Sequence, residues 1–158
     1  LTINNSSGNK NLFQDMIKLA NTAIDKVIQP KKVDILNLLP KKNMVKGSEV
    51  IFRGMYSLQS VYTFGEGDVL LQKGKIFGTA ADYKESKLSY TLLLVKYPSA
   101  TNANNAFNNI ITHLDKTKKI ISKSKNILNF QDHSGKYGSI KIINDLIEMK
   151  VNSTQVLK

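Results

Sequence analysis

The residues best suited to nucleophilic or acid–base chemistry are the two histidines of the chain, His113 and His133. Asp132, His133 and Ser134 are the residue types of a hydrolase triad. Three consecutive residues of one turn cannot form the proton relay, however, because triad members converge from separate segments. His113 falls near the end of a predicted helix, where a cation interacts favourably with the helix dipole. We therefore predict no catalytic residue and a non-enzymatic protein.

Metal ligands and paired carboxylates are equally sparse. The chain has no cysteine, which excludes a disulfide, a thiolate nucleophile, a Cys-ligated zinc and a cysteine-held iron–sulfur cluster. It also has no His-x-x-x-His and no calcium-loop motif. Glu49 and Glu148 would form an acid–base pair only if the fold brought them into one cleft. We expect no metal and no cofactor.

Two further features could in principle bind a small anionic ligand. Segment 64–68 (Phe-Gly-Glu-Gly-Asp) has two glycines, but it lacks the third glycine of a nucleotide-binding fingerprint, and its carboxylates would repel phosphate. Arg53 is the only arginine and follows the apolar residues 50–52. We predict that Arg53 forms an ion pair, and a small-ligand site around it stays an alternative.

The basic charge is concentrated at the two ends of the sequence. The 158 residues contain 23 Lys and Arg against 12 Asp and Glu, a net charge of +11. Residues 1–47 have eight lysines and three aspartates (+5), and residues 115–158 have nine lysines and four acids (+5). The centre, with six basic and five acidic residues, contributes only +1. An acidic protein, an anionic lipid surface or a nucleic acid would be attracted to such ends.

An acidic protein is the partner that we favour. Nucleic-acid recognition prefers arginine and adds aromatic stacking, whereas the basic strips here are lysines without aromatic neighbours. Non-specific nucleic-acid binding stays the main alternative, and self-association stays open. An AT-rich genome would equally account for the lysines, since the chain also has sixteen Asn and sixteen Ile. The residues predicted to contact the partner are Lys31, Lys32, Lys41, Lys42, Lys116, Lys118 and Lys119.

Hydrophobic periodicity predicts one α+β domain, a mostly antiparallel sheet of about five to seven strands packed by two or three helices. Helices are predicted over 12–28 and 99–114, with a short amphipathic segment over 33–39. Strands are predicted over 49–54, 58–64, 75–83 and 88–97, with a lysine-rich edge strand within 116–125 and a hairpin over 137–151. Residues 1–32 form a linker and an amphipathic helix, which either packs on the core or reaches a partner, and residues 33–158 form the domain.

The start of the sequence predicts export. Residues 1–8 are small and polar and lack an initiating Met, like the start of a mature chain after removal of a signal peptide. No apolar run approaches the length of a membrane span; the longest, Leu92 to Val95, is as long as a strand. We therefore expect an extracytoplasmic or periplasmic protein.

The order of several motifs resembles a known family. The motifs are Leu39-Pro40, Val45 to Gly54 (VKGSEVIFRG), Phe64 to Gly67 (FGEG), Leu94 to Pro98 (LVKYP) and Ala106-Phe107. Over residues 36–158 the sequence is similar to a family of uncharacterised bacterial domains, largely exported ones, which has no established catalytic residues. The resemblance implies a non-enzymatic protein-binding role, as an accessory or assembly subunit of a larger extracytoplasmic, redox or respiratory complex.

Overall fold

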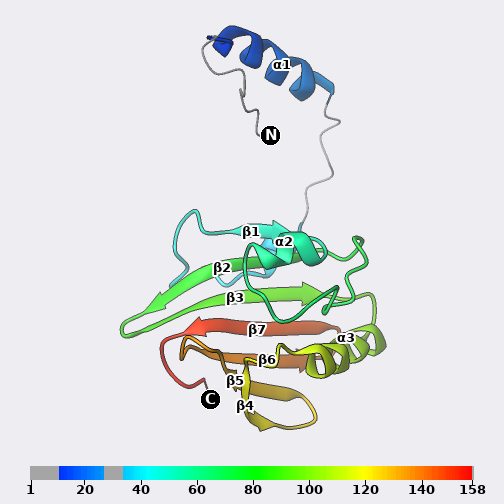
Figure 1. The fold of residues 1–158 in the computed structure, drawn as a ribbon, viewed down its shortest axis with the longest axis vertical. Coiled ribbons are helices and arrows are strands. Elements are labelled where there is room, and N and C mark those ends of the chain that lie inside the picture. The colour runs from blue at the N-terminus through cyan, green and yellow to red at the C-terminus, as the bar shows by residue number, and fades with distance from the viewer. Residues whose placement is uncertain (1–10, 27–33, 158) are drawn as a thin grey trace. The chain divides into compact units, whose positions relative to one another are not determined.

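The computed structural model describes residues 11–26 and 34–157, and the chain divides into two units, residues 1–33 and 34–158 (Figure 1). The first unit contains helix α1 (Phe13–Lys26), as the sequence pattern predicted. Asn11 begins it, because its Oδ1 accepts a hydrogen bond from the Phe13 backbone N–H at 3.1 Å. The end of the predicted helix and the predicted contact residues Lys31 and Lys32 lie outside the described residues.

The second unit contains one seven-stranded antiparallel sheet with few helices, which confirms the predicted α+β class. The strand order across the sheet is β1-β2-β3-β7-β6-β5-β4. The strands are β1 (Val50–Phe52), β2 (Gly78–Glu85), β3 (Leu88–Lys96), β4 (Lys119–Lys123), β5 (Ile127–Gln131), β6 (Tyr137–Ile143) and β7 (Leu146–Ser153). The helices are the short 3-10 helix η1 (Asp34–Leu38), α2 (Met55–Gln59) and α3 (Ala100–His113). No described helix is both long enough and apolar enough to cross a membrane.

The strand predicted over 58–64 is wrong. Residues 55–59 form α2, and the chain from there to Phe64 is irregular, although both Leu58 and Phe64 are buried. Gly54 begins the helix with φ 86°, and its backbone N–H donates to the side chain of the distant Gln72 at 3.0 Å. A left-handed glycine fixed from another segment turns the chain out of the sheet, so this contact outweighs the local preference for a strand.

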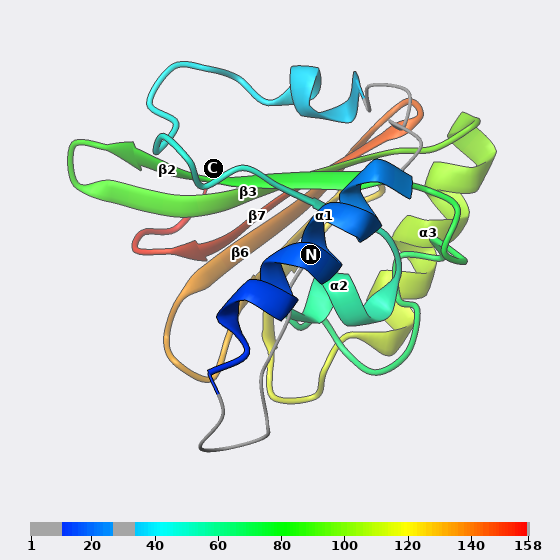
Figure 2. The same ribbon diagram turned by 90° about the horizontal axis from the view of Figure 1, so that it is seen from above.

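The two faces of the sheet are covered to different extents. Helices α2 and α3 lie on one face, and the segment containing η1 lies on the other (Figure 2). The helix-covered face holds the larger core, with Leu93, Ile140 and Phe130 fully buried. The opposite core is smaller and consists of Leu39, Ala81, Tyr83, Leu92 and Leu94, which belong to β2, β3 and the segment after η1. On β7, β6 and β5 that opposite face carries a mixture of polar side chains, such as Glu148 and Lys141, and partly exposed apolar ones, such as Ile143.

Two phenylalanine rings lie directly over glycines of the neighbouring strand. Phe52 of β1 pairs with Gly78 of β2, and Phe130 of β5 pairs with Gly138 of β6. A Cβ atom at Gly78 would lie 2.3 Å from the Phe52 ring, and one at Gly138 would lie 2.1 Å from the Phe130 ring. Only glycine leaves room for these rings, which fill the gaps that the missing side chains would leave in the sheet.

Candidate functional site

The predicted contact residues Lys116, Lys118 and Lys119 lie together, in the turn after α3 and at the start of β4. Asp115 holds this turn, because its Oδ1 accepts hydrogen bonds from Thr117 N–H at 2.8 Å and from Thr117 Oγ1 at 2.7 Å. These bonds, aided by Lys118, hold the pKa of the Asp115 carboxyl below its usual range. A charged Asp115 therefore stabilises the backbone turn that contains Lys116 and Lys118.

Lys118 is held against an aromatic cluster. Its Nζ lies 5.3 Å from the centre of the Tyr62 ring, in the range of a cation–π contact. The Tyr62 ring packs in turn against Phe64 at 4.8 Å and Phe130 at 6.4 Å between ring centres. Burial, and then the charge of Asp132, raise the pKa of the Tyr62 hydroxyl. Lys118 is thus half-buried, whereas Lys116 and Lys119 are exposed.

Two more exposed lysines extend this group along the sheet edge. Lys123 ends β4 and Lys125 lies in the following turn, and both are exposed. We call Lys116, Lys118, Lys119, Lys123 and Lys125 the β4 lysine cluster. None of its members forms an ion pair within the described part of the chain, where the two ion pairs are Lys96–Asp145 at 3.7 Å and Lys150–Glu148 at 3.9 Å. No carboxylate of the described chain lies within ion-pair distance of these lysines, and the nearby charge that acts on one of them is that of Asp115, which attracts Lys118.

Lys41 and Lys42 lie far from the β4 lysine cluster. They follow Pro40 in an exposed turn beside β2, where Asn43 O accepts a hydrogen bond from Lys84 N–H at 3.0 Å. Five strand spacings separate β2 from β4 in the sheet order, a distance of about 24 Å. The two groups of predicted lysines therefore form separate basic sites on the domain.

Lys141 and Lys150 were missed by the sequence-based prediction. The register places Lys141 opposite Glu148 and Lys150 opposite Ser139, on the sheet face that the helices leave open. Lys150 Nζ also lies 5.3 Å from the centre of the Tyr90 ring. The alternation of buried and exposed residues along β6 and β7 contains this signal, but the strand order that places β7 between β3 and β6 does not show in the sequence.

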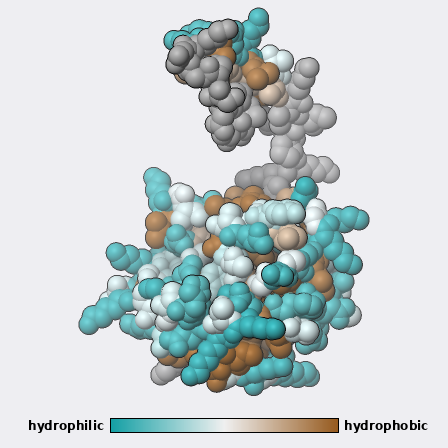
Figure 3. All heavy atoms as spheres, viewed as in Figure 1, coloured by the Kyte–Doolittle hydropathy of each residue, from teal (hydrophilic) through white to brown (hydrophobic). Residues whose placement is uncertain are grey.

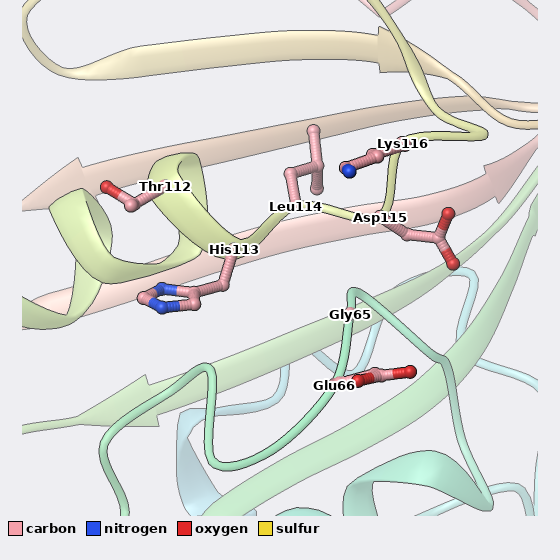
Figure 4. Close-up of a pocket in the computed structure, with 7 residues that line it drawn as sticks. All are labelled: Gly65, Glu66, Thr112, His113, Leu114, Asp115 and Lys116. Atoms are coloured by element: carbon pink, nitrogen blue, oxygen red, sulfur yellow. The ribbon is translucent and has the colours of Figure 1, made fainter.

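A cavity of about 460 Å³ borders the β4 lysine cluster, between the Gly65-Glu66 loop and the end of α3 (Figure 4). His113 Nδ1 lies 3.0 Å from Asn109 O; because a carbonyl oxygen only accepts, Nδ1–H donates this hydrogen bond. The His113 ring points to one side of the loop, and the carboxylates of Glu66 and Asp115 point to the other (Figure 4). The described residues contain no group of three side chains placed to hold a metal ion.

Asp132, His133 and Ser134 form a structural turn. Asp132 Oδ1 accepts hydrogen bonds from Ser134 N–H at 2.9 Å, Ser134 Oγ at 2.7 Å and Lys136 N–H at 3.0 Å. Burial raises the pKa of the Asp132 carboxyl, but the bonds from Ser134 and Lys136 outweigh it and hold that pKa below its usual range. The Ser134 hydroxyl is thus bonded to Asp132, and exposed His133 takes no part in this hydrogen-bond array.

The structure corrects the prediction for Arg53. The Arg53 guanidinium lies 5.3 Å from the centre of the Phe77 ring, and Arg53 forms no ion pair with any described residue. Glu49 and Glu148 do not share a cleft either, because β1 and β7 are three strand spacings apart, about 14 Å. The described structure therefore supports neither a small-ligand site around Arg53 nor an acid–base pair of Glu49 and Glu148.

Three comparisons with known proteins give no match, so the interpretation of the candidate site rests on its geometry. A scan against models of protein families finds no match. Comparison with curated proteins finds none. Comparison with solved structures likewise finds none.

Proposed function

We propose that this protein is a non-enzymatic module that binds an acidic partner protein, as an accessory or assembly subunit of an extracytoplasmic complex. The β4 lysine cluster is the observation that supports the proposal. It places five lysines on one edge of the sheet, and none is paired with a carboxylate of the described chain. The extracytoplasmic setting is proposed from the motif order of residues 36–158 alone, since no family model matches the chain.

Lysines in such positions favour recruitment of an acidic surface over tight, oriented recognition. An ammonium group is a compact, strongly hydrated charge without the planar fork of arginine. Exposed charges of this kind raise the association rate and make the complex sensitive to salt. Asp115 and Tyr62 add order by holding the turn and the Lys118 side chain.

Nucleic-acid binding is less well supported by the same surface. Exposed aromatic platforms would be expected beside the lysines, but the aromatic that contacts the β4 lysine cluster, Tyr62, is packed against Phe64 and Phe130. The open sheet face has Tyr90 and Tyr137, which are only partly exposed, and Tyr90 is stacked on Tyr83 at 5.4 Å between ring centres. The strongly exposed aromatic of the domain, Tyr56, lies on α2.

The test compares two variants with the same loss of charge. K116Q/K118Q/K119Q removes three members of the β4 lysine cluster, and K75Q/K84Q/K87Q removes three exposed lysines elsewhere. Both are assayed for capture of partner proteins from the native compartment, and for binding to polyglutamate and to a 20-nucleotide DNA at matched salt. We expect the cluster variant to bind polyglutamate about five- to thirtyfold more weakly, from about 1–2 kcal/mol for three exposed charges, and the control variant to bind almost normally.

Equal losses in both variants would contradict the proposal, because they would show that only net charge matters. Tighter binding to DNA than to polyglutamate would indicate that the partner is a nucleic acid and not an acidic protein. Loss of a captured partner specifically in the cluster variant would support the proposal and identify that partner.

A further inference from the structure

The β4 strand is an open edge of the sheet. It is the last strand in the order, and its only strand partner among the described residues is β5 (Figure 1). All five of its residues are exposed. The other edge is shorter, since β1 has three residues, and the chain before it covers part of β2 through the Met44–Tyr83 bridge and the bond from Val45 N–H to Asp82 O at 2.8 Å.

The backbone of β4 has hydrogen-bonding groups that point away from β5. Ser124 N–H donates to Ile127 O at 2.8 Å, which makes this pair the hydrogen-bonded one next to the turn. Bonded and non-bonded pairs alternate in an antiparallel ladder. Lys123, which pairs with Leu128, is therefore in a non-bonded pair, and its N–H and C=O point outward.

The side chains of β4 combine apolar and basic character. Ile120 and Ile121 are 46% and 47% exposed, beside a bulge in the β4–β5 pairing. Lys119 and Lys123 stand at the two ends of the strand. Figure 3 shows the same mixture, with hydrophobic surface between hydrophilic side chains at the lower end of the domain, where Figure 1 places β4.

These lysines also select between occupants of the edge. Pairing of β4 with the β4 of a second copy would bring lysines against lysines, and like charges opposite each other destabilise a strand pair. A strand with carboxylates at those positions would instead gain cross-strand ion pairs. The edge is thus unfavourable for self-association and favourable for an acidic segment.

We propose that β4 binds its partner by strand addition, accepting an extended segment of alternating acidic and apolar residues as an eighth strand. The proposal rests on the proposed function and names both the partner segment and the mode of binding. Main-chain hydrogen bonds to outward groups such as those of Lys123 would supply affinity. Apolar side chains of the segment would pack beside Ile120, on the sheet face of its partner Phe130, and its carboxylates would lie beside Lys119, on the opposite face with Gln131.

The experiment uses the full chain and an eight-residue peptide of alternating Glu and Val. A second peptide has the same side chains but is N-methylated at every backbone amide, so it keeps its charge and cannot donate main-chain hydrogen bonds. We expect the methylated peptide to bind about tenfold more weakly or worse. Titration by NMR should also give cross-strand NOEs between the unmodified peptide backbone and the Lys123 amide.

Two variants at Lys123 separate backbone from charge. K123A removes the ammonium group and keeps the N–H, whereas K123P removes both. Because the Lys123 N–H does not bond to β5, K123P leaves the β4–β5 ladder intact. We expect K123P to bind the peptide about tenfold more weakly than K123A, with both melting temperatures close to that of the parent chain.

Four results would overturn strand addition. If both peptides bind equally and K116Q/K118Q/K119Q weakens both, the acidic-partner function stands but the contact is by charge alone. If neither peptide depends on these lysines, the proposed function also fails. Binding of an oligonucleotide in preference to the peptide would assign the edge to nucleic acid, and a dimer of the free protein that K123P dissociates would assign it to a second copy. If K123P unfolds the chain, the peptide comparison and the Lys123 NOEs still decide.

Discussion

Substitution of Gly65 tests how the loop beside α3 positions the β4 lysine cluster. A Cβ atom at Gly65 would lie 2.0 Å from the His113 carbonyl oxygen and 3.2 Å from its carbon. These are backbone atoms at the end of α3, so no side chain can rotate away. In the same contact, the Phe64 carbonyl accepts a hydrogen bond from the Asp115 N–H at 2.8 Å.

The cost of G65A follows from this geometry. To reach an ordinary contact of 3.4 Å from 2.0 Å, the loop and the helix end must separate by about 1.4 Å. That displacement breaks the bond between Phe64 and Asp115, at about 1 kcal/mol, and adds about 1–3 kcal/mol for the overpacked backbone. We expect G65A to lower the free energy of unfolding by about 2–4 kcal/mol. It should also weaken acidic-peptide binding, because Asp115 holds the turn that includes Lys116 and Lys118.

Urea denaturation measures the free energy of unfolding, and G67A is the matched control in the same loop. Gly67 has φ 77°, and a Cβ atom added there would have no atom within 4 Å. Alanine at this position therefore meets only the strain of a left-handed backbone, about 1 kcal/mol. Both changes stiffen the unfolded chain equally, so the difference between them isolates the clash. A G65A variant as stable as G67A, with unchanged dependence on urea, would refute the reasoning.

Three further substitutions test the fold. Y97F removes the buried bond from Tyr97 Oη to Leu70 O, 2.6 Å long, and should cost about 1–2 kcal/mol in urea; no loss would mean that the carbonyl finds another donor. Asp132 has a lowered pKa in the folded chain, so its stabilisation is present above the unfolded pKa of about 3.9 and is lost as the pH falls through the folded pKa. The difference in melting temperature between the parent chain and D132N should therefore shrink below pH of about 4, and a constant difference would count against this role. G138A should cost about 1–3 kcal/mol by clashing with Phe130, and adding F130L should restore much of it.

Local sequence signals predicted those elements whose contacts are close in the chain. The hairpin of β6 and β7 was predicted from its two-residue turn, and Asn144 in that turn has φ 54°, a conformation that asparagine tolerates well. Helix α3 was predicted from its apolar stripe, and Ser99 caps it by accepting from the Asn102 N–H. In both cases neighbouring residues carry all of the information.

Elements that depend on distant contacts were predicted wrongly or missed. Residues 58–64 have the composition of a strand, but the bond between Gly54 and Gln72, eighteen residues apart, sets the local backbone. Strand β5 has only five residues, and it becomes a strand through pairing with β4 and β6 on either side. Neither effect can be derived from periodicity.

The candidate site divides in the same way. Lys116, Lys118 and Lys119 are close in the sequence, and they are close in the structure for the same reason. The separation of Lys41 and Lys42 from them follows from the strand order, which places β2 and β4 far apart in one sheet. The outward backbone groups of Lys123 follow from a register that only the paired strands define.

The strands of the sheet are buried to different extents, so we expect the free energy of local unfolding to differ between them. Strand β3 is buried on both faces, with Leu92, Leu93, Leu94 and Val95 all 3% exposed or less, whereas every residue of β4 is exposed. Opening of β3 would expose both cores and requires global unfolding, but β4 can detach with little loss of buried surface. A ligand that binds only attached β4 would stabilise this last strand selectively. Binding at the proposed β4 edge would therefore change the order of β4 more than that of any other strand of the domain.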